Sequence, residues 1–206
     1  MTEILHAIGQ GLRIPCHIVL LLLIAVAVME IGYVIYEAAE RTGSDKIHTV
    51  ELLHTMRGKT PPEIRALLDQ EPFLNRHKLV FSRLLDTADL PEATRLAAAR
   101  RMLEEEEDYY RRIVRITDTV AKLGPMFGLL GTLIPLGPGI AALGRGDTAT
   151  LSAAMSSAFD TTIAGVIAAA VCALISTIRK RWYAQAMSDV EAVMEGCLQE
   201  MKEAGQ

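Results

Sequence analysis

Three long apolar stretches interrupt an otherwise polar chain, at residues 14–36, 123–143 and 151–178. A helix needs roughly 20 apolar residues to cross a hydrocarbon core ~30 Å thick, and each stretch meets that length. The pattern therefore predicts three transmembrane helices. The second and third are joined only by the short polar turn 144–150, so they form a hairpin.

The polar parts of the chain also carry helical patterns. Residues 1–13 place their apolar side chains on one helical face, which predicts an amphipathic segment in the membrane interface. In the polar insert 37–122, we expect one helix capped by Ser44 or Asp45, a second starting at Thr60, and a third between residues 75 and 87.

Long helices are expected to extend the hairpin beyond the membrane. One begins near Glu92 and continues into the second span, and the apolar stripe of residues 179–206 continues the third span. The predicted fold is all-α, an integral membrane protein with three transmembrane helices and long helical extensions.

Basic residues predict the orientation of the spans. They lie in the polar segments just before and just after the hairpin, whereas the turn 144–150 holds only Arg145 as a basic residue. The basic residues of these two segments are Arg111, Arg112, Arg115, Lys122 and those at 179–181. Because cytoplasmic flanks carry an excess of Lys and Arg, residues 37–122 and the C-terminal segment are predicted to be cytoplasmic. Three spans then place the N-terminus outside.

Composition agrees with a membrane protein and excludes several classes of function. Of 206 residues, 50% are hydrophobic, and the mean hydropathy is +0.25, too apolar for a typical soluble domain. The net charge of −4 gives no basic excess for nucleic acid. The chain has no Walker lysine motif and no hydrolase signature, so we predict that it is not an enzyme and holds no cofactor. Because ionisable and hydroxyl groups lie inside the spans, an ion gradient is the expected source of energy.

The three cysteines carry no ligand spacing. Cys16, Cys172 and Cys197 lie far apart, with no CxxC or Cys/His pattern. We interpret them as small apolar packing residues and predict no metal site.

Small residues recur at helical spacing on both arms of the hairpin. Gly128 and Gly131 lie on the first arm and Gly165 on the second, accompanied by Gly124, Gly139, Ala154, Ala158 and Ala169. Such stripes let the backbones of spanning helices approach closely, so these glycines are predicted to be packing positions.

Two motifs on the hairpin resemble those of the MotA, TolQ and ExbB proton-channel family. They are G-L-L-G-T at residues 128–132 and T-x-x-G at residues 162–165, in consecutive spans joined by a tight turn. The layout of one span, a cytoplasmic insert and a hairpin is similar to ExbB and TolQ and differs from the four-span MotA pattern. We therefore expect a protein of the cell inner membrane.

The resemblance implies a function. It implies a homo-oligomeric ring, a pentamer in the family, around a pair of single-span partner subunits related to ExbD, TolR or MotB. A transmembrane aspartate of these partners takes and releases protons, and the ring supplies a threonine-lined wall of a motor driven by the proton-motive force. The chain alone is not expected to conduct.

The same resemblance assigns pore-facing threonines. It places Thr132 and Thr162 on the ion pathway, with the adjacent Thr161 as a competitor for the second position. The alternative is that these hydroxyls bond to the carbonyl one turn back within their own helices, as threonine commonly does.

One position departs from the family pattern. ExbB-like and TolQ-like members carry a glutamate five residues before the second threonine, where this chain has Ser157. The ionisable residue well inside the third span is Asp160, which stands about 160° around the helix from Thr162. It binds protons, pairs with a neighbouring subunit, or bonds as a buried acid to Ser156 and Ser157.

Two further charged groups allow two interpretations each. Glu30, late in the first span, is either a functional group or an interfacial residue beside Tyr33, Tyr36 and Glu37. The acidic run 104–108 pairs with following arginines, as in Glu107 with Arg111 and Asp108 with Arg112, or else lines a portal for ions.

Two rival functions remain at this stage. One is a scaffold membrane protein in which small-residue stripes serve only helix packing. The other is a small secondary transporter, which three spans without an internal repeat disfavour. The sequence leaves open whether the ion is H⁺ or Na⁺, which partner is engaged and which process the gradient drives.

Overall fold

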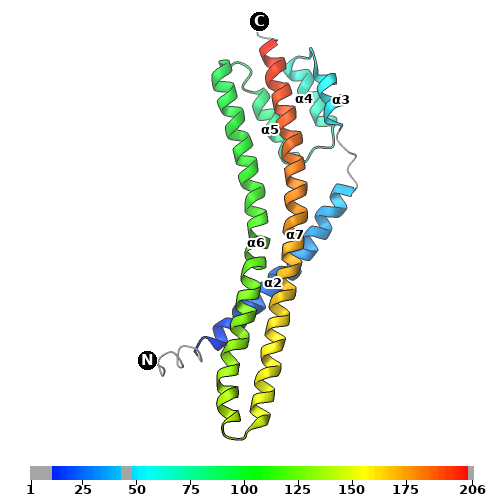
Figure 1. The fold of residues 1–206 in the computed structure, drawn as a ribbon. Helices are drawn as coiled ribbons and strands as arrows, with labels where there is room; N and C mark the ends of the chain where they lie inside the picture. The colour runs from blue at the N-terminus through cyan, green and yellow to red at the C-terminus, as the bar shows by residue number, and fades with distance from the viewer. Residues whose placement is uncertain (1–10, 43–47, 204–206) are drawn as a thin grey trace. The chain divides into compact units, whose positions relative to one another are not determined.

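The computed structural model describes residues 11–42 and 48–203, and all its regular structure over those residues is helical. The helices are α2 (Arg13–Thr42), α3 (Thr49–Met56), α4 (Pro61–Gln70), α5 (Asn75–Leu85), α6 (Glu92–Leu143) and α7 (Thr148–Glu203) (Figure 1). By length and composition, α2, α6 and α7 can each cross a membrane. The all-α prediction with three candidate spans is confirmed. The predicted segment 1–13 falls largely outside the described residues.

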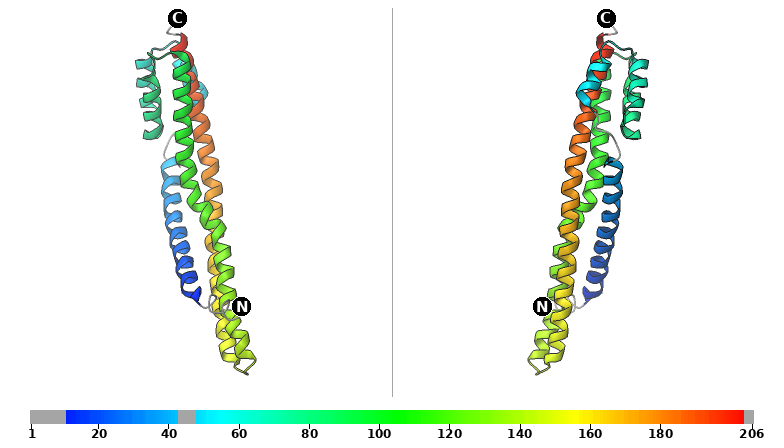
Figure 2. Two further views of the ribbon diagram at one scale, coloured as in Figure 1. Left: turned by 90° about the vertical axis from the view of Figure 1, so that its left-hand side faces the viewer. Right: turned by 90° about the vertical axis from the view of Figure 1, so that its right-hand side faces the viewer.

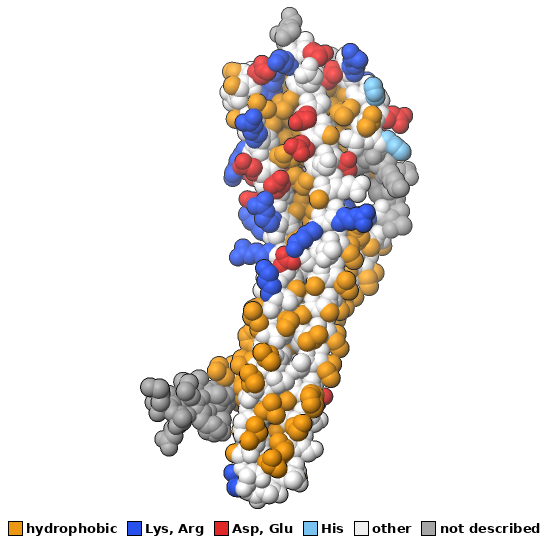
Figure 3. All heavy atoms as spheres, viewed as in Figure 1, with side chains coloured by type: hydrophobic (Ala, Val, Ile, Leu, Met, Phe, Trp, Pro, Cys, Tyr) orange, Lys and Arg blue, Asp and Glu red, His pale blue; other side chains and the backbone are white. Residues whose placement is uncertain are grey.

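The chain divides into two compact units, each of which is described by itself. The hairpin unit comprises residues 1–37 and 113–179, and the insert unit comprises residues 38–112 and 180–206. In the hairpin unit, α6 and α7 run side by side in opposite directions and α2 lies along them (Figure 2). Apolar side chains cover the face of this unit seen in Figure 3, as expected of a surface that meets lipid.

The helix that enters the second span is continuous, as the sequence predicted. α6 begins at Glu92 and ends at Leu143, and it passes through Pro125, Pro135 and Pro138. Prolines are tolerated in spanning helices because neighbouring helices and local adjustments satisfy the freed carbonyl groups. The predicted extension of the third span is also confirmed, since α7 continues from Thr148 to Glu203.

The turn between α6 and α7 is closed by its own chemistry. Gly146 has φ of +79°, a left-handed conformation that glycine adopts without strain. Asp147 then accepts hydrogen bonds from the backbone N–H and the hydroxyl of Thr150, at 3.0 and 2.5 Å. These bonds lower the pKa of the Asp147 carboxyl and satisfy the first turn of α7.

A second predicted helix start is present in the insert unit. Glu63 accepts hydrogen bonds from the backbone N–H and the hydroxyl of Thr60, at 2.8 and 2.7 Å, in the capping box that precedes α4. The predicted third helix of the insert corresponds to α5, and its predicted first helix corresponds to α3. α3 begins at Thr49 with His48 as its N-cap, so the predicted start at Ser44 or Asp45 is wrong; those two residues lie outside the described residues.

Apolar side chains of α3, α4 and α5 pack against α7 to form the core of the insert unit. The buried residues are Leu52, Met56, Ile64, Leu68, Phe73, Phe81, Leu84, Val190, Val193 and Cys197. Full burial of one such large side chain stabilises a fold by about 1.5–3 kcal/mol.

Cys16, Cys172 and Cys197 are all buried free thiols, which agrees with their predicted packing role.

A neutral histidine is buried beside this core. His77 is 3% exposed, and its Nε2 shares a hydrogen bond of 2.6 Å with the hydroxyl of Tyr110, whose ring packs on Tyr183 at 4.4 Å. Burial lowers the pKa of His77 to about 4, with smaller contributions from the charges of Arg76 and Arg41. The imidazole is therefore uncharged at neutral pH.

We expect the insert unit to lose stability as the pH falls from about 6.5 to about 4. In that window the unfolded chain binds a proton at His77 and the folded chain does not, which lowers the free energy of unfolding by up to about 3 kcal/mol. His77→Gln should remove this dependence, and exposed His54→Gln should keep it. Urea unfolding followed by Trp182 fluorescence measures the effect, and equal pH profiles for both variants would contradict it.

Candidate functional site

The two arms of the hairpin meet at glycines. A Cβ built on Gly165 of α7 would lie 2.6 Å from the carbonyl oxygen of Gly124 and 3.0 Å from the Cα of Gly128, both on α6. A Cβ on Gly131 would lie 2.8 Å from the Oγ1 of Thr161. Gly165 thus lies where the two backbones approach too closely for a side chain, and Gly131 lies directly against the side chain of Thr161. The Cβ of a residue at Gly128 would be in ordinary contact, at 3.4 Å, with the backbone of Thr161 and Thr162.

The three candidate threonines hydrogen-bond within their own helices. Thr132 donates to the carbonyl of Leu129 at 2.6 Å, and Thr161 donates to the carbonyl of Ala158 at 2.9 Å. Thr162 has longer bonds, 3.3 Å to Ala158 and 3.4 Å across the hairpin to the carbonyl of Gly128. These local bonds match the alternative interpretation, while Thr162 is the least firmly held of the three.

The threonines also differ in their exposure. Thr161 is buried against Gly131, whereas Thr132 and Thr162 are each half-buried. Thr132 and Thr162 therefore retain some access from outside the chain, which a hydroxyl on an ion pathway requires. Thr161 has little access, so the structure separates it from the other two candidates.

Asp160 lies on the outer surface of α7. Its side chain is exposed, and it forms no hydrogen bond or ion pair with any described residue, Ser156 and Ser157 included. Its neighbours on that surface include the largely exposed apolar residues Phe159 and Ile163 and the exposed Ser156. Within one described chain, the bond to Ser156 or Ser157 that the sequence allowed is absent.

A charged cluster is buried between α2 and α7. The guanidinium of Arg179 is 0% exposed, and it donates to Glu30 at 2.5 Å and to Glu37 at 3.3 Å. The ring of Tyr33 covers it, with its centroid 4.9 Å from Cζ. Two carboxylates and an aromatic face together offset the desolvation of the buried cation. Glu30 is thus an ion-pairing residue that holds α2 on α7.

This cluster corrects one interpretation of the sequence. The sequence grouped Arg179 with residues 180 and 181 as basic residues that flank the hairpin on its cytoplasmic side. Arg179 faces inward instead, because the two glutamates of α2 lie seven residues apart on one helix face and meet it there.

A second polar contact joins α6 and α7 in the hairpin unit. The hydroxyl of Ser176 donates to the carboxylate of Asp118, and Ser176 is buried. Thr117, the neighbour of Asp118, is also buried and donates to the carbonyl of Val114 at 2.9 Å. Charged or hydroxyl side chains therefore tie both α2 and α6 to α7.

The acidic run of α6 is largely engaged in ion pairs. Arg111 contacts Glu107 at 3.1 Å, as predicted, but it also contacts Asp108 at 3.5 Å, so the predicted pair of Asp108 with Arg112 is wrong. One guanidinium reaches carboxylates both three and four residues earlier. Glu106 is buried and pairs with Arg76 of α5 at 2.5 Å.

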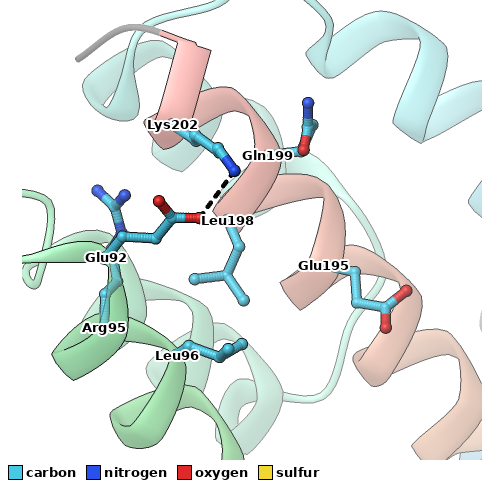
Figure 4. A pocket seen from close by; sticks show the side chains of 7 residues that line it. All are labelled: Glu92, Arg95, Leu96, Glu195, Leu198, Gln199 and Lys202. Carbon is cyan, nitrogen blue, oxygen red and sulfur yellow. Dashed lines mark ion pairs between the residues drawn. The ribbon is translucent and has the colours of Figure 1, made fainter. Parts of the chain in front are cut away.

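A hollow of about 180 Å³ lies in the insert unit, between the start of α6 and the end of α7. Figure 4 shows Leu96 and Leu198 facing each other across it, with the Glu92–Lys202 ion pair of 2.9 Å at its side. Two acidic and two basic side chains line it, including Arg95 and Glu195, so the hollow carries no net charge that would select an ion.

Sequence analysis missed the role of Arg179. Its partner Glu30 is 149 positions away, and no helical periodicity relates residues on separate helices. A usable signal was present in α2, where Glu30, Tyr33 and Glu37 are spaced by three and four residues and share one face. Two acids on one face of a spanning helix indicate that a cation on a neighbouring helix pairs with them.

Comparison with known protein families supports the resemblance carried by the hairpin motifs. Residues 49–192, more than half of the chain, match the MotA/TolQ/ExbB proton channel family. Among curated proteins, none matches the chain at a significant level. The matched range contains residues 49–122 of the polar insert, both arms of the hairpin and the threonine and glycine positions described above. Three helices able to span a membrane and the family match together identify a multi-pass membrane protein. The chain belongs to the MotA/TolQ/ExbB proton channel family.

Proposed function

We propose that this chain is a ring subunit of a complex driven by the proton-motive force, with five copies around a single-span partner of the inner membrane. In this proposal the ring and the partner together form the ion pathway, and the partner contributes a transmembrane aspartate. The family match supports a role as a proton channel in membrane energy transduction. The number of copies and the partner come from the family resemblance.

One observation carries the proposal for this chain. Asp160 is an exposed carboxylate beside the exposed apolar side chains of Phe159 and Ile163 on a candidate spanning helix, and it has no hydrogen-bond or ion-pair partner among the described residues. A charged group at such a position costs about 2.5–3.5 kcal/mol or more when it faces lipid. A second protein, either a neighbouring copy or the single-span partner, therefore covers this surface in the assembly we propose.

The threonines fit the proposal in unequal ways. Thr132 and Thr162 are half-buried and so remain accessible to a pore, and we assign the pathway to them. Thr161 is placed against Gly131 and serves packing. Asp160 and Thr162 lie on opposite sides of α7, about 160° apart, so an Asp160 that titrates does so at a subunit contact.

The alternative is a scaffold protein that conducts no ions. It is favoured by the intrahelical bonds of all three threonine hydroxyls, which satisfy them without a pore. A neighbouring gene that encodes a single span with an aspartate would separate the two proposals at little effort, because a scaffold needs no such partner.

Proton flux into vesicles that contain the chain and this single-span protein tests the proposal. If Asp160 binds protons in the pathway, Asp160→Asn should lower flux roughly a hundredfold, the low end of what a positioned acid–base group contributes to proton transfer. Thr132→Val with Thr162→Val should also lower flux, because volume is nearly kept while both hydroxyls are lost. A pH-sensitive dye reports flux, and native mass in mild detergent should show five copies for every variant.

The controls separate the parts of the proposal. Thr161→Val should leave flux nearly unchanged. Full flux in Asp160→Asn would return proton binding to the aspartate of the partner, and full flux in the double valine variant would assign both hydroxyls to packing. A monomer in detergent and in nanodiscs would contradict the ring itself.

A further inference from the structure

One face of α6 in the hairpin unit is left uncovered along its length. Arg115, Thr119, Lys122, Met126, Leu129 and Leu133 follow one another at spacings of three or four residues. At 100° per residue, all six point within about 40° of the direction of Arg115. We call these six residues the α6 outer face.

The other sides of α6 are already assigned. Gly124, Gly128 and Gly131 point about 140–180° away from the α6 outer face and meet α7. Val120 and Phe127, about 120–140° to one side, belong to the cluster that packs on α2. Thr132 points about 100° to the opposite side, so the proposed ion pathway does not use the α6 outer face either.

The first part of the α6 outer face is cationic. Arg115 and Lys122 are both exposed, and neither forms an ion pair within the described residues. Thr119 lies between them and donates its hydroxyl to the carbonyl of Arg115 at 2.7 Å. The acid Asp118 accepts from Ser176 of α7. The two basic side chains therefore present unpaired positive charge to the surroundings.

The rest of the α6 outer face is apolar and built from large side chains. Met126, Leu129 and Leu133 are 64%, 59% and 60% exposed. Contacts between spanning helices favour small residues, and this face has none in that stretch, so it is suited to acyl chains instead. The exposed surface of α7 differs, because Asp160 interrupts its apolar side chains.

The dimensions of the α6 outer face match one leaflet of a membrane. Lys122 and Leu133 are 11 residues apart, which is roughly 16 Å along a helix. Half of a ~30 Å hydrocarbon core is about 15 Å. The distance from Lys122 to Leu133 thus equals the depth of one leaflet, and the apolar residues Met126 to Leu133 cover about 10 Å of it. Cations at one end of such a track match the charge of an anionic headgroup above an acyl chain.

We propose that the α6 outer face binds one anionic phospholipid. Arg115 and Lys122 reach its phosphate from either side, and its acyl chain lies along Met126, Leu129 and Leu133. The inference stands apart from the proposed function, because it requires no ring, partner or gradient.

Quenching by brominated lipids tests the site in the full chain. Met126→Trp places a fluorophore on the α6 outer face, and the parent chain supplies the background from Trp182, its single tryptophan. The protein is placed in vesicles that contain brominated phosphatidylglycerol or brominated phosphatidylcholine. We expect several-fold preferential quenching by phosphatidylglycerol, since each basic residue near an anionic surface contributes roughly fivefold in affinity.

Matched variants assign the preference to the two cations. Arg115→Gln with Lys122→Gln should abolish it, and Arg115→Lys with Lys122→Arg should keep it. Arg100→Gln removes one exposed, unpaired cation from the part of α6 in the insert unit and should have no effect. Circular dichroism identifies any variant that fails to fold. If the double glutamine variant fails, the folded variant with Arg115→Lys and Lys122→Arg still shows whether positive charge at these positions keeps the preference.

Three results would overturn the proposal. The first is equal quenching by both lipids, which means that the face does not select headgroup charge. The second is weak quenching by both, which means that a second protein copy covers the face. The third is loss of the preference in excess inorganic phosphate, which means that the cations bind free phosphate rather than a lipid.

Discussion

Arg179→Met is expected to lower the free energy of unfolding of the hairpin unit by about 3–5 kcal/mol, the usual result of removing one partner from a buried ion pair. Glu30 and Glu37 are only 15% and 14% exposed, and both pair with the same guanidinium. Without it, two carboxylates remain in a low-dielectric setting. Methionine keeps much of the side-chain volume, so lost charge rather than lost packing dominates the effect.

Unfolding by SDS in mixed micelles, followed by circular dichroism, measures this loss. Arg181→Met is the matched control, because Arg181 is exposed and its substitution removes the same charge two residues away. It should change the free energy of unfolding by no more than about 0.5 kcal/mol. Equal effects of Arg179→Met and Arg181→Met would mean that the buried cluster does not hold α2 in place.

A compensating variant separates the ion pair from its surroundings. Arg179→Met combined with Glu30→Gln and Glu37→Gln removes all three charges, and it should recover much of the stability that Arg179→Met loses. Replacing a complete buried ion pair by uncharged groups is often close to neutral, whereas breaking one is not. Failure of this variant to recover would point to the Tyr33 contact as the larger contribution.

The features that sequence predicted here are those set by local patterns. The length of the apolar stretches predicted three candidate spans, and the helical spacing of apolar residues predicted the continuous helix α6. The spacing of Thr60 and Glu63 predicted a helix start. Each depends on residues within a few turns of one another. Periodicity and length are sufficient for such features.

The features that sequence did not predict depend on which helix faces meet. Arg179 belongs by position to a run of basic residues, and only the approach of Glu30 and Glu37 turns it inward. Arg111 takes the partner expected for Arg112 because its guanidinium reaches two carboxylates at once. Competition among alternative partners is decided by tertiary geometry, which a single sequence does not contain.

The candidate site divides in the same way. Motif spacing indicated the glycines and threonines of the hairpin, and the placement of the glycines, Thr161 and Thr162 at the contact of α6 and α7 follows from the small side chains. The exposure of Asp160 could not be predicted, since its three possible roles required different surroundings. Among the described residues Asp160 has no bond to Ser156 or Ser157, so proton binding and subunit contact are the two roles that we propose for it.

Gly165→Leu is expected to separate the two arms of the hairpin. The Cβ of any larger residue would lie 2.6 Å from the carbonyl oxygen of Gly124 and 3.2 Å from the backbone nitrogen of Gly128. Backbone atoms cannot rotate away as side chains do, so α6 and α7 must move apart. Overpacking usually costs about 1–3 kcal/mol, and we expect this variant to lie at or above the upper end of that range.

Gly137→Leu provides the matched control, because a Cβ at Gly137 meets no atom within 4 Å. It makes the same change in the same hairpin, and its SDS unfolding midpoint should stay close to that of the parent chain. Gly165→Ala should fall between the two, since its single added methyl meets the same backbone atoms. Similar midpoints for Gly165→Leu and Gly137→Leu would contradict the close approach of α6 and α7.

Gly165→Leu also tests whether the proposed ion pathway depends on the packing of α6 against α7. The hydroxyl of Thr162 lies 3.4 Å from the carbonyl of Gly128, at the contact that Gly165→Leu forces open. Separation of the helices should therefore displace Thr162 and lower proton flux in vesicles containing the partner, while Gly137→Leu keeps flux near the parent level. Normal flux in a Gly165→Leu protein with a lowered unfolding midpoint would show that conduction does not depend on the geometry of this contact.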